Sequence, residues 1–144
     1  MLEVGKSYSI SVTATDEVIK NIAKISGDVN PIHLNDEYAA SSIFGRRIAH
    51  GLFCINAISM IIGNYLPGPG AVLVEQSFQY KKPVYIGDEI RVTVTVRERM
   101  CKDLYLLNTI CRNQVGQLVL DGVSKIKWEE DNETIGLLER TCDV

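Results

Sequence analysis

The chain has 144 residues, of which 46% are hydrophobic and 23% are charged, and its formal net charge is −3. This length fits one domain with a substantial core, and the ordinary composition excludes disordered, collagen-like and coiled-coil proteins. The mild acidity argues against a nucleic-acid-binding surface, and two histidines are too few for a zinc site with several imidazole ligands.

The first half of the chain predicts a strand, a helix and then a longer core helix. Residues 6–13 alternate as a strand does, and Thr15 then caps a helix that Gly27 ends. Residues 28–48 combine loop with a short helical piece at 35–40. An apolar helix follows over about 50–65 and is broken at 66–70. Because it is apolar on nearly every face, yet too short to span a membrane, we expect it to be buried.

The second half predicts long strands over 71–82, 88–100, 103–112 and 117–128, with a turn at 113–116. No crossover helix follows any of them, so the sheet should be largely antiparallel. One long helix with four or five such strands predicts an α+β protein whose sheet curls around the helix. We assign residues 1–128 to this domain and 129–144 to a C-terminal extension.

The cysteines and the chain ends bear on the compartment. The four cysteines form no CxxC pair, and a core of this size needs no disulfide. No basic, apolar leader opens the sequence, and no lipid-anchor or peroxisomal signal closes it. We therefore expect reduced cysteines, a cytoplasmic location and no membrane association.

One short segment, Ile25–His33, combines residue types that suit acid–base chemistry. Asp28 precedes His33 by five residues, and between them Asn30 can fold back on the backbone while Pro31 fixes φ. A rigid turn of this kind can point a carboxylate and an imidazole at one water, as proton transfer near neutral pH requires. The alternative is structural: Asp28 caps local amides and His33 makes a hydrogen bond within the fold.

A second segment, His50-Gly51, lies at the start of the predicted core helix. A helix N-terminus exposes unpaired N–H groups, and a glycine lets an oxygen approach the backbone closely, as in an oxyanion hole. Ser59 follows two turns later on the same broad side, where we expect a buried hydroxyl that needs a partner.

These motifs resemble the MaoC-like family, and more narrowly its (R)-specific enoyl-CoA hydratases. The similarity rests on residues 25–33, 49–51, 66–68 and 82–88, which occur in family order and extend over about residues 5–128. The resemblance implies a hot-dog fold, in which an antiparallel sheet wraps a central helix. It also implies a homodimer with the acyl tunnel near the subunit interface.

The resemblance implies a role for each matching residue. Asp28 and His33 would hold the reacting water, and Gly51 would donate its amide to the thioester oxygen. Ser59 would support the site's hydrogen-bond network, and Asn30 would order the turn. The implied reaction is hydration of a trans-2-enoyl thioester to the (R)-3-hydroxyacyl thioester, or its reversal, with no cofactor and no metal. Coenzyme A and acyl carrier protein both stay open as the carrier.

Several neighbouring residues are expected to be less directly involved. His50 should be structural. Two pairs of basic residues could bind the phosphates of coenzyme A, namely Arg-Arg at 46–47 and Lys-Lys at 81–82. Charge pairs of this kind are more often exposed to solvent without a ligand. Bulky residues should line the tunnel floor, namely Phe53, Ile58, Met60 and Ile61.

Two other functions fit the same fold. An acyl-CoA thioesterase would use the helix-start amide but would not need the turn at 28–33. A non-catalytic acyl-thioester-binding module would be expected to carry a DNA-binding appendage or to have lost the acid–base pair, and neither is evident.

Overall fold

The computed structural model of the protein describes residues 2–129. The C-terminal extension assigned to 129–144 therefore lies outside the described residues, except for its first residue. The elements, in chain order, are β1 (Ser7–Thr13), α1 (Asp16–Ser26), α2 (Pro31–Leu34), α3 (Asp36–Ala40), α4 (Leu52–Asn64), β2 (Val72–Tyr80), β3 (Glu89–Arg99), β4 (Leu104–Arg112) and β5 (Leu118–Lys127).

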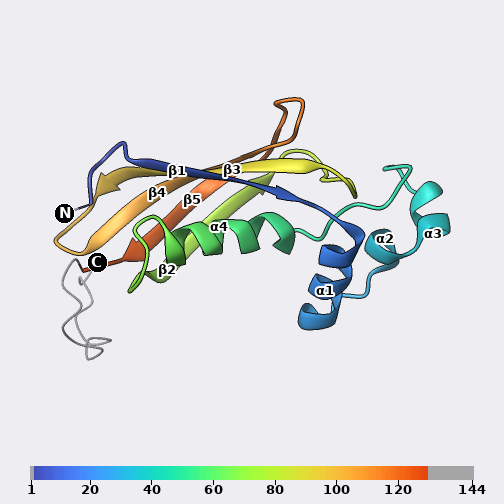
Figure 1. Cartoon of the computed structure of the whole chain (residues 1–144), viewed down its shortest axis with the longest axis horizontal. Helices are drawn as coiled ribbons and strands as arrows, with labels where there is room; N and C mark the ends of the chain where they lie inside the picture. The colour runs from blue at the N-terminus through green and yellow to red at the C-terminus, as the bar shows by residue number, and fades with distance from the viewer. Residues whose placement is uncertain (1, 130–144) are drawn as a thin grey trace.

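The strands form one sheet in the order β1-β3-β4-β5-β2, and every neighbouring pair is antiparallel. The sheet lies across α4, and α1–α3 gather at one end of it (Figure 1). Strand β3 shows why the pattern was predictable, since Ile90, Val92, Val94 and Val96 alternate with polar residues and are all buried. The predicted α+β class and antiparallel sheet are confirmed.

Helix α1 begins and ends where its capping residues predict. The Thr15 hydroxyl accepts a hydrogen bond from the Val18 N–H at 3.1 Å. Gly27 adopts a left-handed conformation, with φ of 75°, and its N–H donates to the Ala23 carbonyl at 2.9 Å. Both contacts lie within a few residues in sequence, so local composition suffices to determine them.

Helix α4 differs from the prediction in one respect, because only one side of it is buried. Its buried side packs beneath the sheet through Phe53, Cys54, Ala57, Ile58, Ile61 and Ile62. On the opposite side Leu52 and Met60 are 40% and 39% exposed, and Asn56 and Ser59 are exposed too. The sheet covers the helix from one direction only, so the expectation of burial on nearly every face is wrong for the single chain.

Arg47 holds the α1–α3 end together. Its side chain is 10% exposed, and its guanidinium lies 2.8 Å from Asp16 and 3.1 Å from Asp36, at the starts of α1 and α3. A hydrogen bond from Lys20 lowers the pKa of Asp16, and the positive charge of Arg47 adds to this. Arg47 is thus engaged within the fold rather than free for a phosphate.

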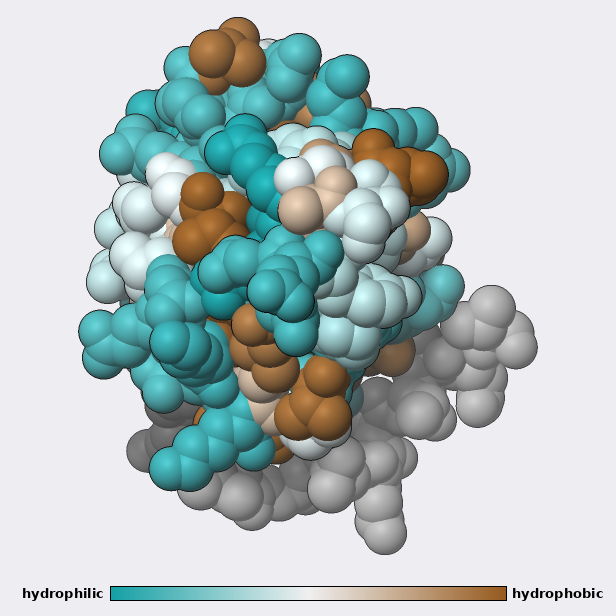
Figure 2. Space-filling view, turned by 90° about the vertical axis from the view of Figure 1, so that its right-hand side faces the viewer, coloured by the Kyte–Doolittle hydropathy of each residue, from teal (hydrophilic) through white to brown (hydrophobic). Residues whose placement is uncertain are grey.

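Figure 2 shows this end of the molecule, where apolar residues form separate patches among polar ones.

Two further observations concern the cysteines and the membrane. Within residues 2–129 the thiols of Cys54 and Cys111 are free, and Cys142 lies outside the described residues. In the same part of the chain, no helix combines the length and the apolar character needed to cross a membrane.

Candidate active site

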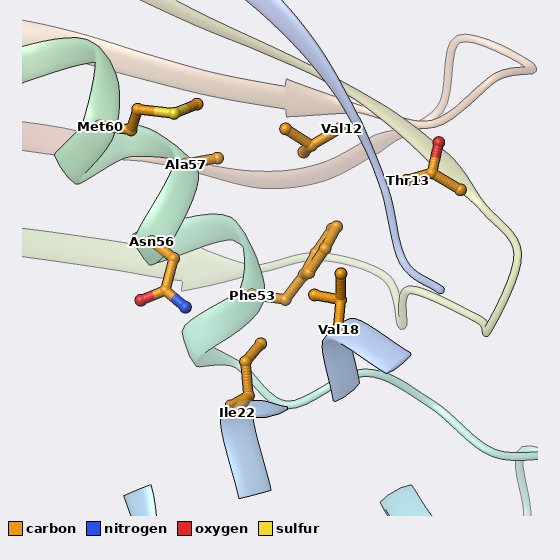
Figure 3. Close-up of a pocket in the computed structure, with 8 residues that line it drawn as sticks. All are labelled: Val12, Thr13, Val18, Ile22, Phe53, Asn56, Ala57 and Met60. Atoms are coloured by element: carbon orange, nitrogen blue, oxygen red, sulfur yellow. The ribbon is translucent and has the colours of Figure 1, made fainter. Parts of the chain in front are cut away.

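The chemistry-bearing residues gather around a cavity of about 410 Å³ at the start of α4. His33, His50 and Gly51 line it, together with Tyr80 and the exposed Lys82. A second cavity, of about 330 Å³, lies where side chains of β1, α1 and α4 meet (Figure 3). None of the described residues that line this second cavity has an ionisable side chain, so we place the acid–base chemistry at the first.

The predicted tunnel floor is not assembled as expected. Phe53 and Met60 line the second cavity rather than the one beside His33. Ile58 and Ile61 are fully buried in the core and line neither. The prediction chose these residues for their bulk, which does not tell which face of α4 meets the sheet.

The turn before His33 is ordered by successive side-chain hydrogen bonds. The Asp28 carboxylate accepts from the Asn30 N–H at 3.1 Å, and the Asn30 side chain accepts from the Ile32 N–H at 3.2 Å. Asn30 is thereby the N-cap of α2, with Pro31 at its first position. The sequence predicted an irregular turn here, and the structure corrects this to a turn followed by a four-residue helix that holds His33.

His33 is buried, and its ring is oriented by the backbone. Its Nδ1 lies 2.8 Å from the Ile48 carbonyl oxygen, which can only accept, so Nδ1 carries the hydrogen. The Nε2 lone pair then lies 3.9 Å from the Asp28 carboxylate, which is about half exposed. The structure therefore places an imidazole nitrogen and a carboxylate beside the same small space.

His50 adjoins both members of this pair. Its Nε2 lies 3.0 Å from the backbone carbonyl oxygen of Asp28, and its ring stacks on that of His33 with centroids 4.0 Å apart. The ring is 3% exposed, and its Nδ1 has no hydrogen-bond partner among the described residues. His50 is thus the residue through which the turn and the start of α4 meet.

Gly51 precedes the first turn of α4, and its N–H has no acceptor among residues 2–129. Its φ of −54° is open to any residue, so backbone conformation does not explain the glycine. The explanation is Tyr80, whose hydroxyl donates to the Gly51 carbonyl at 3.3 Å and would lie 2.9 Å from a Cβ placed on Gly51. An amide with a free N–H is thus held beside the cavity under an aromatic ring.

Sequence reasoning missed Tyr80. It ends β2, 29 residues after Gly51, and no local pattern connects the two. Burial raises the pKa of the Tyr80 phenol, so the phenol keeps its proton and acts as a donor. Cys54 lines the same cavity, and a hydrogen bond with the Cys111 thiol lowers its pKa. The same bond and burial raise the pKa of Cys111.

Ser59 is not where the sequence placed it. In the single chain it lies on the exposed side of α4 and lines neither cavity, so its hydroxyl is not a buried group in need of a partner. The error has the same origin as that for the helix as a whole, because the sheet leaves this side of α4 uncovered.

Folding creates one possible metal-binding group that sequence spacing did not suggest. Asp28, His33 and His50 each offer a ligand atom, and these atoms lie within 4.8 Å of one another. The His33 Nε2 and the Asp28 carboxylate face the same space, whereas the His50 Nε2 is already bonded to the Asp28 carbonyl. Two of the three could therefore bind a metal ion without breaking a hydrogen bond of the fold.

A family model described as a MaoC like domain matches residues 3–110 of the chain. The chain belongs to the MaoC-like family. The segment from Asp28 to Gly51, which contains both halves of the site, lies within the matched range. Tyr80, which covers Gly51, lies within it too.

Curated members of the MaoC-like family resemble the chain over most of its length. It is 39% identical to a 3-hydroxybutyryl-CoA dehydratase of Methylorubrum extorquens, over 96% of this chain and 88% of the relative. It is 36% identical to an (R)-specific enoyl-CoA hydratase of Rhodospirillum rubrum, over 87% of each.

Among solved structures, the (R)-hydratase of Aeromonas caviae, described as involved in PHA biosynthesis, has a TM-score of 0.85 at 34% identity. That similarity covers 89% of this chain and 98% of the other. An unliganded R-hydratase of Pseudomonas aeruginosa has a TM-score of 0.86 at 34% identity, over 97% of this chain and 92% of the other. These similarities confirm the predicted hot-dog fold.

The contact between Gly51 and Tyr80 gives a testable prediction. Gly51→Ala should displace the phenol, because its Cβ would lie 2.9 Å from the Tyr80 oxygen. We expect kcat/KM for crotonyl-CoA hydration to fall about tenfold, since a misplaced wall of the site misaligns the substrate. In a Tyr80→Ala background, the same glycine substitution should cost less than about twofold. An equal loss in both backgrounds would show that the glycine is required for another reason.

Proposed function

We propose that the protein is an (R)-specific enoyl-CoA hydratase, which adds water reversibly to trans-2-enoyl-CoA to form (R)-3-hydroxyacyl-CoA. The observation that supports this most directly is the joint position of three groups. The Asp28 carboxylate and the His33 Nε2 lie 3.9 Å apart, and His33 and the free amide of Gly51 line the same cavity. The relatives described as hydratase and dehydratase support the same reaction, read in its two directions.

Asp28 and His33 suit the binding of one water. A water oxygen can lie about 2.8 Å from both acceptors when these are 3.9 Å apart. Because both groups accept, the two O–H bonds of that water point toward them and an oxygen lone pair points away. The pair thus both orients the nucleophile and takes up the proton that it loses.

Gly51 supplies the complementary group. Its N–H stabilises the negative charge that develops on the thioester oxygen as the water oxygen bonds to C3 and the C2–C3 double bond becomes an enolate. The proton removed from water by the Asp28–His33 pair then passes to C2, and the carbonyl re-forms. Oxygen and proton come from the same side, so the addition is syn. Asn30 contributes by capping the helix that holds His33.

We further propose that the enzyme is a homodimer. Among residues 2–129, strand β2 pairs only with β5 and its other edge has no partner strand. On this strand Val72, Leu73 and Val74 are 54%, 40% and 56% exposed. Free strand edges and exposed apolar residues of this kind favour association. The exposed side of α4, with Ser59, is a second surface for a partner to cover, and Ser59 would then reach the site's network only in the dimer. The free thiols of Cys54 and Cys111 and the coenzyme A substrate fit a cytoplasmic enzyme.

The experiment is to mix the protein with crotonyl-CoA and identify the product. The proposal predicts (R)-3-hydroxybutyryl-CoA with no release of free thiol. Free coenzyme A would indicate a thioesterase, and binding without any product would indicate a non-catalytic module. Either outcome would contradict the proposed function.

A further inference from the structure

His50 contacts both members of the acid–base pair and lines the same cavity. Its Nε2 lies 3.0 Å from the Asp28 carbonyl oxygen, and its ring stacks on the ring of His33. A peptide bond joins it to Gly51, the next residue in the chain. The three groups come from the turn after α1, from α2 and from the start of α4. Among residues 2–129, only His50 combines a hydrogen bond to Asp28, stacking on the His33 ring and a peptide bond to Gly51.

The hydrogen-bond partners fix the tautomer of His50. The Asp28 carbonyl oxygen can only accept, so the His50 Nε2 carries a hydrogen. Nδ1 is buried and has no partner among the described residues, and an unpaired N–H there would be costly. These contacts favour the tautomer that carries its hydrogen on Nε2 and none on Nδ1. His33 has the opposite arrangement, since its Nδ1–H donates to the Ile48 carbonyl.

We propose that His50 is a positioning residue. It orients the Asp28 carboxylate and the His33 ring toward one water and fixes both relative to the Gly51 amide. This inference rests on the proposed function. The hydrogen bond to the Asp28 carbonyl sets where the turn, and hence the carboxylate, lies. The stack fixes the plane of the His33 ring, so that its Nε2 lone pair points to the water rather than past it. Groups that orient catalytic residues in this way commonly affect activity by about 10- to 100-fold.

Two substitutions separate the hydrogen bond from the stack. His50→Phe keeps a ring against His33 but has no donor for the Asp28 carbonyl. His50→Gln has no ring but can place an amide N–H near the position of Nε2. We expect His50→Phe to lower kcat for crotonyl-CoA hydration by about 10- to 100-fold with KM changed less than about threefold, and His50→Gln to recover part of that loss.

A matched control is Ile62→Ala, which removes a buried side chain near the other end of α4. It should lower the melting temperature while leaving kcat within about twofold, so lost stability and lost positioning are distinguishable. A kcat for His50→Phe within twofold of the wild type would overturn the proposal. So would equal losses in the Phe and Gln variants.

A second readout does not depend on activity. His33 and His50 are the only histidines of the chain, so long-range ¹H–¹⁵N spectra contain just two imidazole rings. We expect one ring in the Nδ1–H form and the other in the Nε2–H form, assigned by the His50→Phe variant. Two rings in the same form, or rings that average between forms, would overturn the inference. A wild type that is inactive on crotonyl-CoA but shows this tautomer pair would contradict the proposed function alone.

Discussion

Asp28→Asn is expected to lower kcat for crotonyl-CoA hydration by about 10²–10³-fold, because an amide cannot take the proton that the attacking water loses. The fold should survive the change. The carboxylate is 47% exposed, and its one backbone hydrogen bond, from the Asn30 N–H, can be accepted equally well by the amide oxygen of asparagine. We therefore expect a melting temperature within about 2 °C of the wild type.

Asp36→Asn is the matched control for this change. Asp36 is another exposed carboxylate at the α1–α3 end, 90% exposed and paired with Arg47. Its substitution should leave kcat within about twofold, because surface ion pairs contribute little and none of the reacting groups is touched. An Asp28→Asn enzyme that hydrates crotonyl-CoA at nearly the wild-type rate would remove Asp28 from the mechanism.

His33→Asn should produce a loss of similar size. Asparagine can still place an N–H near the Ile48 carbonyl, where the His33 Nδ1 lies at 2.8 Å, but it has no group at the position of Nε2. We expect kcat to fall about 10²–10³-fold. The buried stack on His50 is lost as well, so the melting temperature should also fall. Rates should be compared well below the melting temperature of the variant.

The double variant Asp28→Asn/His33→Asn tests whether the two residues act on one water. If they do, removing the second costs little once the first is gone, and the double variant should be no more than about threefold slower than the slower single variant. Multiplicative losses would show that the residues act in separate steps.

Local sequence predicted those parts of the fold that depend on near neighbours. Thr15 and Gly27 bound α1 through contacts three or four residues away, and the alternation in β3 directly reflects its two faces. The exposed side of α4 was not predictable in this way. That side combines the apolar Leu52 and Met60 with the polar Asn56 and Ser59, and the position of the sheet determines which side is covered.

The candidate site likewise contains residues that local sequence indicated and contacts that only the fold creates. Asp28, Asn30 and His33 lie within six residues, so one short segment indicated their joint chemistry. The contact of Tyr80 with Gly51 depends on where β2 ends relative to α4, which no local pattern records. Ser59 differs again. Its exposure in the described chain contradicts the expected burial, whereas the role that the resemblance implies for it stays a prediction.

The most direct test of the mechanism is the stereochemistry of hydration in D₂O. If Asp28 and His33 handle one water on one side of the double bond, its oxygen bonds to C3 and a deuteron is added to C2 from the same side. The account predicts (R)-3-hydroxybutyryl-CoA from crotonyl-CoA, with a single deuterium at C2 in the syn relation to the hydroxyl. An anti product, a mixture of both diastereomers, or free coenzyme A would contradict it.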